Sequence, residues 1–166
     1  MRRLLPLATG AALVATTIAL APPAAAKVTM GAPTVRLTAP YAKSPTEVVV
    51  VAKVTQTSYK DISLDIALEG FQAKQAFDYA KGACPTSVIV VDTPLIVLEC
   101  GWQQEGTRAT LRLALGGTLS SGTVKVRIKS RAVTAPAKAG MYPVSLSSWA
   151  FPTVKTQVSI ASGPVK

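Results

Sequence analysis

The sequence contains no histidine and no asparagine, and it has only 8 acidic residues against 18 lysines and arginines. The absence of histidine removes the commonest metal ligand and the commonest general acid or base. The absence of asparagine removes every acceptor for N-glycosylation. There is also no Ser–Lys motif that would activate a nucleophile without histidine. We therefore expect a protein that is not an enzyme and that uses no cofactor and no metal.

The balance of charge favours anionic partners. The formal net charge is +10, and it remains +8 without Arg2 and Arg3. Such a charge suits contact with an anionic polymer, an acidic protein, nucleic acid or a membrane surface. Nucleic acid is the least favoured of these partners, because aromatic residues that could stack on bases do not stand between the cations.

The N-terminal residues are typical of a secretion signal. Arg2 and Arg3 precede the apolar run Leu4–Ala21, and Ala24–Ala26 provides a small-residue cleavage site. We expect cleavage after Ala26, which leaves 166 − 26 = 140 residues, enough for one domain with a core. An uncleaved membrane anchor is the alternative, but the run is short for a span and is interrupted by proline and glycine.

The exported part is expected to hold a loose lead-in over residues 27–33 and one domain over residues 34–166. The sequence ends at Lys166 with neither an apolar tail nor a sortase-type motif. We therefore expect the protein to be secreted, or to be associated loosely with the cell wall.

Alternating apolar and polar residues predict strands along most of the domain. The clearest segment is Asp61–Glu69, where four aliphatic residues point one way and the acids point the other. The acids are too far apart along a strand for a glycosidase pair, because i and i+4 lie roughly 13 Å apart. Further strands are expected at Thr34–Thr38, Thr46–Thr57, Thr107–Leu115, Gly122–Ala132, Tyr142–Ser148 and Val154–Ile160.

These segments predict an all-β sandwich of about seven to nine antiparallel strands. One segment is ambiguous. Residues 71–81 carry alanines at helical spacing and are followed by Gly82, which favours a short helix. Phe71, Phe77 and Tyr79 would also fit a strand.

Cys84 and Cys100 are the only cysteines. An even count in an exported chain predicts a disulfide, and the separation does not match a redox motif. A hairpin centred on Asp92 would place the two cysteines opposite one another. The alternative is that the segments on either side of Asp92 lie in different sheets, so that the bridge crosses the core.

The strands Thr107–Leu115 and Gly122–Ala132 carry most of the outward cations. If the turn pairs Leu115 with Gly122, Arg112 falls opposite Lys125 and Arg108 falls opposite Lys129. Like charges opposite one another are mildly destabilising, which suggests a functional use. A solvated face that discourages edge-to-edge pairing is the alternative. The predicted anion- or partner-binding surface consists of Arg108, Arg112, Lys125, Arg127, Lys129 and Arg131.

The acids suggest a second surface. Asp61, Asp65 and Glu69 share one predicted strand, which we expect on the sheet opposite the basic strands. A domain with one acidic and one basic face would be able to associate with itself head to tail.

Two tryptophans are candidate recognition residues. Trp102 lies in a segment bounded by Gly101 and Gly106, and Trp149 joins the last two predicted strands. Binding residues often lie on such loops, although both side chains would also fit a role in covering the core. A rigid loop around Trp102 or Trp149 would suit a secreted enzyme inhibitor, which is the alternative to a domain that binds an envelope component or a protein.

Three short stretches resemble the immunoglobulin-like modules of secreted actinobacterial surface proteins. They are Gly117–Val124, Thr134–Pro136 and Ala139–Val144. The resemblance implies a sandwich that presents surfaces and has no catalytic residues. It also implies that Gly140 and Tyr142 form a tyrosine corner, in which the hydroxyl bonds to nearby backbone. Val144 stands where an antibody domain has its second cysteine, so the disulfide is placed differently.

Overall fold

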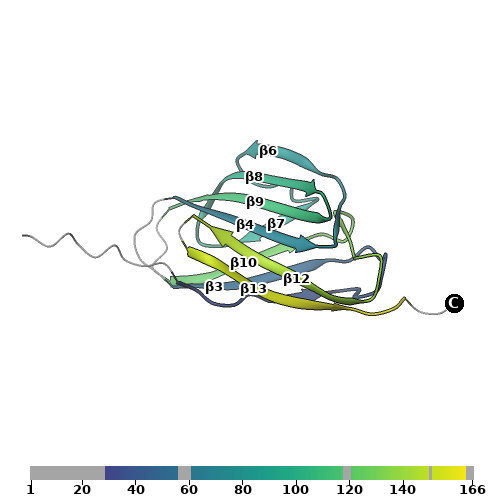
Figure 1. Ribbon diagram of the computed structural model, residues 1–166. Coiled ribbons are helices and arrows are strands. Elements are labelled where there is room, and N and C mark those ends of the chain that lie inside the picture. The colour runs from purple at the N-terminus through teal and green to yellow at the C-terminus, as the bar shows by residue number, and fades with distance from the viewer. Residues whose placement is uncertain (1–28, 56–60, 118–120, 150, 164–166) are drawn as a thin grey trace, which may run out of the picture.

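The structure is a computed structural model that describes residues 29–55, 61–117, 121–149 and 151–163. The predicted signal peptide and its cleavage site lie outside these residues. Among the described residues there are thirteen strands and no helix (Figure 1). No described segment is therefore a helix able to cross a membrane.

The larger sheet has six antiparallel strands in the order β13-β12-β4-β9-β8-β6. Their bounds are β13 (Phe151–Ile160), β12 (Gly140–Ser148), β4 (Asp61–Glu69), β9 (Arg108–Gly116), β8 (Ile96–Glu105) and β6 (Phe77–Lys81). The predicted strand at residues 61–69 is confirmed, and it lies within the sheet between β12 and β9.

The smaller sheet has five strands in the order β1-β3-β10-β7, with β2 also paired to β3. Their bounds are β1 (Thr29–Met30), β2 (Thr34–Leu37), β3 (Val48–Thr55), β7 (Ile89–Asp92) and β10 (Ser121–Ile128). The short strands β5 (Gln72–Ala73) and β11 (Val133–Thr134) pair separately. Because β1 pairs with β3, the sheet includes part of the segment that was expected to be a loose lead-in.

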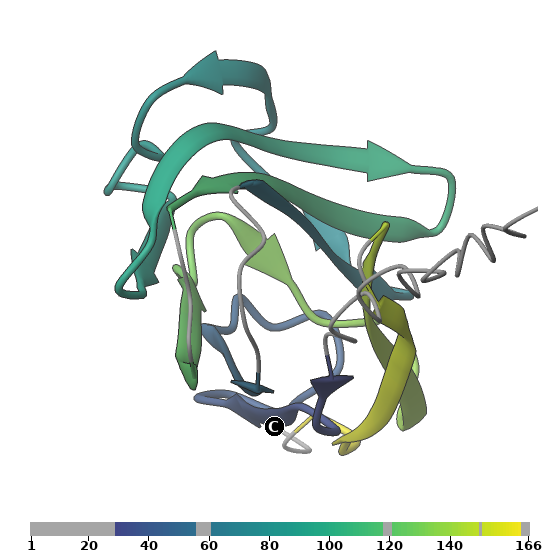
Figure 2. The same ribbon diagram turned by 90° about the vertical axis from the view of Figure 1, so that its left-hand side faces the viewer.

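The two sheets face one another and enclose one core, so the all-β sandwich is confirmed. Figure 2 shows the teal strands of the larger sheet above and the purple strands of the smaller sheet below, with yellow β12 and β13 down one side. The apolar residues predicted to point inward from β3 and β4 are buried. These are Val48, Val50, Ala52 and Val54 on β3, and Ile62, Leu64, Ile66 and Leu68 on β4.

The predicted pairing of β9 with β10 is wrong. β9 pairs with β4 and β8 in the larger sheet, whereas β10 pairs with β3 and β7 in the smaller one. Alternation assigns the two faces of a strand, but it does not identify the neighbouring strand. One of the true partners of β9 is β8, which is joined to it by the two-residue turn Gly106–Thr107. Gly106 was expected to end a loop, and Thr107 was expected to begin the strand.

The predicted helix near residues 71–81 is also wrong. This segment forms β5 and β6, and Phe77 pairs with Trp102 of β8. The helical spacing came from alanines, whose small side chains are tolerated in either structure. Phe77 is partly buried against the core, and this contact agrees with the strand alternative.

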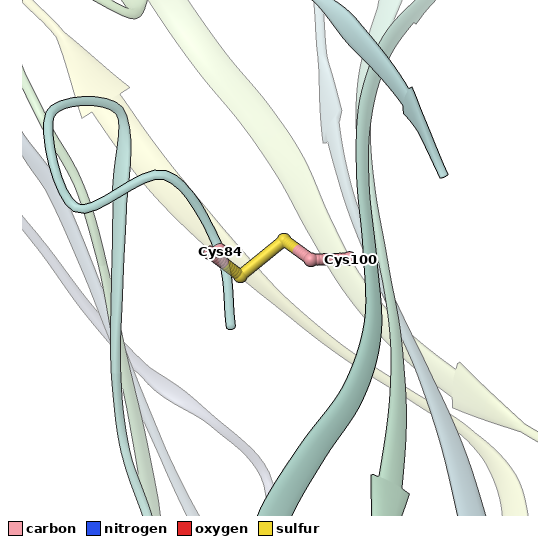
Figure 3. The surroundings of a disulfide bond; sticks show 2 residues. All are labelled: Cys84 and Cys100. Carbon is pink, nitrogen blue, oxygen red and sulfur yellow. A yellow bond between two sulfur atoms is a disulfide. The ribbon is translucent and has the colours of Figure 1, made fainter. Parts of the chain in front are cut away.

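The predicted disulfide between Cys84 and Cys100 is confirmed, with Cα atoms 5.3 Å apart (Figure 3). Cys84 lies in the loop between β6 and β7, and Cys100 points into the core from β8. The segments on either side of Asp92 lie in different sheets, because β7 pairs with β10 and β8 pairs with β9. The expected hairpin centred on Asp92 is therefore wrong, and the alternative, in which the two segments belong to different sheets, is correct. In the chain-entropy model, a disulfide that closes a loop of this length adds roughly 3 kcal/mol to the free energy of unfolding.

The tyrosine corner has the expected geometry. The Tyr142 hydroxyl donates to the backbone oxygen of Lys138 at 3.0 Å. Its ring lies against Gly70, where an added Cβ would stand 2.6 Å from Tyr142 Cε1 and 3.3 Å from Pro136 Cγ. Gly70 also has a positive φ of 77° and donates its N–H to the backbone oxygen of Thr107 at 2.8 Å. The corner therefore packs on a position that only glycine can occupy without strain.

We predict that Gly70→Ala lowers the free energy of unfolding by about 3 kcal/mol, because it combines a left-handed backbone cost with a clash against Tyr142. Gly106→Ala is the matched control. Gly106 also has a positive φ, 61°, but an added Cβ would meet nothing within 4 Å. It should cost only about 1 kcal/mol. Urea denaturation measures both variants, and equal losses would show that the Tyr142 contact adds nothing.

Candidate functional site

Arg108 and Arg112 do not belong to one surface with the other predicted cations. They lie on β9, beside the acids of β4, with Glu69 in register with Arg108 and Asp65 in register with Arg112. Arg108 Nε lies 3.2 Å from Glu69 Oε1, and Arg112 is ion-paired to Glu105 of β8. The expectation of six cations without acids is therefore wrong, because two of them are neutralised within their own sheet.

The same arrangement corrects the expectation of an acidic face opposite the basic strands. Asp65 and Glu69 share the outer face of the larger sheet with the two arginines of β9. The side chain of Asp61 lies outside the described part of the molecule. Acids and cations thus alternate on this face, and the described residues hold no group of three potential metal-ligating side chains.

Burial raises the pKa of Asp65; the Arg112 charge opposes this shift and Glu105 adds to it. The carboxylate of Glu105 already serves Arg112 and also accepts a hydrogen bond from the Thr110 hydroxyl at 3.2 Å. Arg112, which stands in register with Asp65, is therefore already ion-paired to Glu105. Ionisation of Asp65 therefore costs more free energy in the folded state than in the unfolded state, where the carboxylate is fully solvated.

Two of the other predicted cations, Lys125 and Arg127, lie on the outer face of the smaller sheet. Lys125 and Arg127 point outward from β10, because the residues between and beside them are buried. Two further cations join them from neighbouring strands, Arg36 of β2 and Lys53 of β3, and both are exposed. We call Arg36, Lys53, Lys125 and Arg127 the basic face.

The strand register fixes the layout of the basic face. Arg36 and Arg127 both pair with Val49 and so lie two strands apart, about 10 Å. Lys125 and Arg127 are about 7 Å apart along one strand. The half-buried Val49, Val51 and Val90 form the floor between the cations, and a shallow hollow beside β7 is lined by Val90, Val91, Asp92, Lys125 and Arg127.

Among the described residues, two acids lie beside these four cations. Arg127 Nε lies 3.4 Å from Glu47 Oε1, yet this buried nitrogen has no hydrogen bond among the described residues. Asp92 stands in register with Lys125 across β7 and β10. The basic face therefore keeps an excess of positive charge, with part of the Arg127 guanidinium open to solvent.

The last two predicted cations, Lys129 and Arg131, follow the end of β10 beside the loop that leads into β7. The backbone N–H of Lys129 donates to the oxygen of Val88 at 2.9 Å. Arg131 Nε donates to the backbone oxygen of Ser87 at 2.6 Å. These contacts give Arg131 a structural role at the start of β7. Arg36 and Lys53 were not predicted as part of the binding surface, although alternation within Thr46–Thr57 already placed Lys53 on the outward face.

Trp102 is not a recognition residue. It is fully buried in β8, and its indole Nε1 donates to the backbone oxygens of Lys74 at 3.1 Å and Ala132 at 3.0 Å. The prediction failed because residues 101–105 continue the strand instead of forming a loop. Trp102 therefore ties β8 to the segments that surround β5 and β11.

Trp149 remains a candidate recognition residue. Its side chain is 64% exposed, at the connection between β12 and β13. This connection lies at the end of the sandwich, as the sequence analysis expected of a contact loop.

We predict that Trp102→Phe lowers the free energy of unfolding by about 2 kcal/mol, because it removes both hydrogen bonds of the indole Nε1, although the Ala132 oxygen keeps the Lys74 N–H as a donor at 2.7 Å. Trp149→Phe is the matched control, and it should change stability by less than about 0.5 kcal/mol. Thermal or urea denaturation measures both. A larger loss for the Trp149 variant would contradict this assignment.

We predict that Asp65→Asn stabilises the protein at neutral pH. The folded state favours the protonated carboxyl, so stability falls as the pH rises from below the ordinary aspartate pKa through the raised pKa. The neutral amide avoids this loss, and we expect a gain of less than about 1 kcal/mol because Asp65 is partly solvated. The gain should vanish in acid. The control is Asp92→Asn, which removes an acid beside Lys125 and should give no gain; denaturation curves at about pH 7 and about pH 3 test both.

Comparison with known proteins identifies no family. No family model matches the chain, and no curated protein matches it. Among solved structures, BslA, described as a bacterial hydrophobin, is 14% identical with a TM-score of 0.46, over 83% of this chain and 99% of that one. A DUF4466 family protein from Parabacteroides merdae is 9% identical with a TM-score of 0.41, over 81% and 44% of the two chains. A non-cellulosomal cohesin from Archaeoglobus fulgidus is 12% identical with a TM-score of 0.27, over 80% and 85%. These values are too low to transfer a site or a function.

Proposed function

We propose that this protein is a non-catalytic exported domain that binds an anionic polymer of the cell envelope through the basic face. One observation carries the proposal: four outward cations stand on three neighbouring strands with only two acids among them. The cations of β9, by contrast, are paired with acids of their own sheet. The basic face is thus a surface on which several cations stand close together with an excess of positive charge.

The spacing of the basic face suits a linear partner. Four charges spread over about 7 to 10 Å intervals fit a chain of repeated anionic groups better than one compact anion. The valine floor between them would contact the apolar parts of such a polymer. Because these charges are largely solvated, we expect the affinity to fall steeply as the salt concentration rises.

Export is supported by the disulfide. Disulfides persist in oxidising compartments and are rare in the cytosol. The bridge between Cys84 and Cys100 therefore agrees with the N-terminal signal that the sequence predicts. A location at the cell wall or in the medium would bring the basic face into contact with envelope polymers.

Two alternatives use other features. An acidic protein would also complement the basic face, and it would compete with the polymer for the same residues. An enzyme inhibitor would present a rigid loop, and the burial of Trp102 leaves Trp149 as its only candidate aromatic among the two. Affinity capture with secreted proteases tests that second alternative.

We predict that the double variant Lys53→Glu, Lys125→Glu binds a soluble polyuronate at least about tenfold more weakly than the unaltered protein at low salt, because two attractive contacts become repulsive. Neither residue forms an ion pair within the described part of the chain, and both lie on the solvent side of their strands. Isothermal titration calorimetry at two salt concentrations measures the affinity and its salt dependence.

The control is Lys74→Glu, Lys138→Glu, which changes the net charge equally but lies near the tyrosine corner. It should retain most of the affinity. Equal losses in both double variants would show that net charge, and not the basic face, attracts the polymer. Fractionation of the producing cells with and without high salt provides the matching test on native envelope material.

A further inference from the structure

A patch of exposed apolar side chains lies on the outer face of the larger sheet. Ile96, Leu98 and Tyr79 are 69%, 42% and 49% exposed. Leu98 lies over Gly116, where an added Cβ would stand 2.9 Å from Leu98 Cδ1, and the Tyr79 ring lies 3.7 Å from the corresponding position at Gly101. Gly116 therefore leaves room for Leu98 to lie flat, whereas Tyr79 rests on Gly101 at ordinary contact distance. We call Tyr79, Ile96 and Leu98 the apolar patch.

The surroundings of the apolar patch carry both signs of charge. Lys81 of β6 stands in register with Glu99 of β8 at its border. Further along the same face, Arg112 is paired with Glu105, and Arg108 with Glu69. A surface whose opposite charges lie side by side can complement a copy of itself across a two-fold axis.

We propose that two copies of this chain associate through the outer faces of their larger sheets, with the apolar patches in contact. The area of this interface follows from the strand geometry. It spans four strands, β4, β9, β8 and β6, about 4.8 Å apart, and about nine residues along each at about 3.3 Å per residue, which gives roughly 600 Å² per copy. The total of roughly 1,200 Å² is the lower limit for a specific interface, so the dimer is weak and depends on concentration.

The other face of the sandwich does not offer this association. The basic face would place Lys125 and Arg127 of one copy against the same excess of cations in the next. The expected head-to-tail contact between an acidic and a basic face also loses its basis, because Asp65 and Glu69 are balanced by the arginines of β9. Self-association through the apolar patch buries exposed apolar surface and brings together faces that carry both signs of charge.

Such a dimer would present its two basic faces on opposite sides. If the proposed binding of an anionic polymer holds, one dimer would engage two polymer segments and cross-link them. The second contact would then form at a raised effective concentration. This consequence depends on the proposed function, whereas the association itself does not.

The test is sedimentation equilibrium of the purified protein without any polymer, up to about millimolar concentration, where weak interfaces are populated. We expect a monomer–dimer equilibrium that Ile96→Lys weakens by roughly ten- to a hundredfold, because one apolar anchor is lost. Tyr79→Ser should also weaken it. Tyr41→Ser is the matched control: Tyr41 is 42% exposed but lies outside the patch, so its variant should dimerise normally.

Circular dichroism tests whether each variant is folded. Ile96 and Tyr79 are both exposed, so their substitution should leave the fold intact. A monomer at every concentration would overturn the proposal, as would a dimer that only the Tyr41 variant disrupts. Failure of the polymer-binding test would leave the dimer unaffected, so the two proposals can fail separately.

Discussion

The pairing of β4 with β9 is the interaction on which the arrangement of the molecule depends. The acids of β4 and the arginines of β9 both recur every four residues, and the antiparallel register places Asp65 beside Arg112 and Glu69 beside Arg108. The Glu69–Arg108 ion pair contributes roughly 0.2–1 kcal/mol, whereas the Arg112 charge only offsets part of the cost of burying Asp65. A shift by one residue would also expose the apolar residues of β4. Charge and burial therefore select the same register, which fixes these two strands inside the larger sheet.

Once β9 is paired on both sides, β10 has to continue in the other sheet. It pairs with β3 and β7 there, and its cations come to lie beside those of β2 and β3. Trp102 and the disulfide hold β8 against the loops that lead to the smaller sheet. The division of charge between the two sheets is thus a consequence of strand pairing: one outer face is balanced, and the other keeps the excess of cations.

The sequence predicted the strands, their inward faces, the disulfide and the corner at Tyr142, because each depends on local alternation or on a few residue types. It did not predict which strands are neighbours, since β9 fits β4 and β10 equally well by apolar pattern. The predicted register would have opposed Arg112 with Lys125 and Arg108 with Lys129. The repulsion between these cations was interpreted as a sign of function. It is instead a reason why β9 and β10 do not pair. Trp102 was misplaced because glycines on both sides resemble a loop.

The excess charge of the basic face does not disturb the apolar core, because the charged and apolar side chains lie on opposite sides of β10. Lys125 and Arg127 alternate with Val126 and Ile128, which are buried, so the cations can gather without entering the apolar interior. The cost appears at Arg127, whose buried Nε is ion-paired to Glu47 Oε1 at 3.4 Å but forms no hydrogen bond among the described residues. An unsatisfied donor beside concentrated positive charge is destabilising in the free protein. An anionic partner that neutralises this face would remove the repulsion, and it would therefore stabilise the folded state to which it binds.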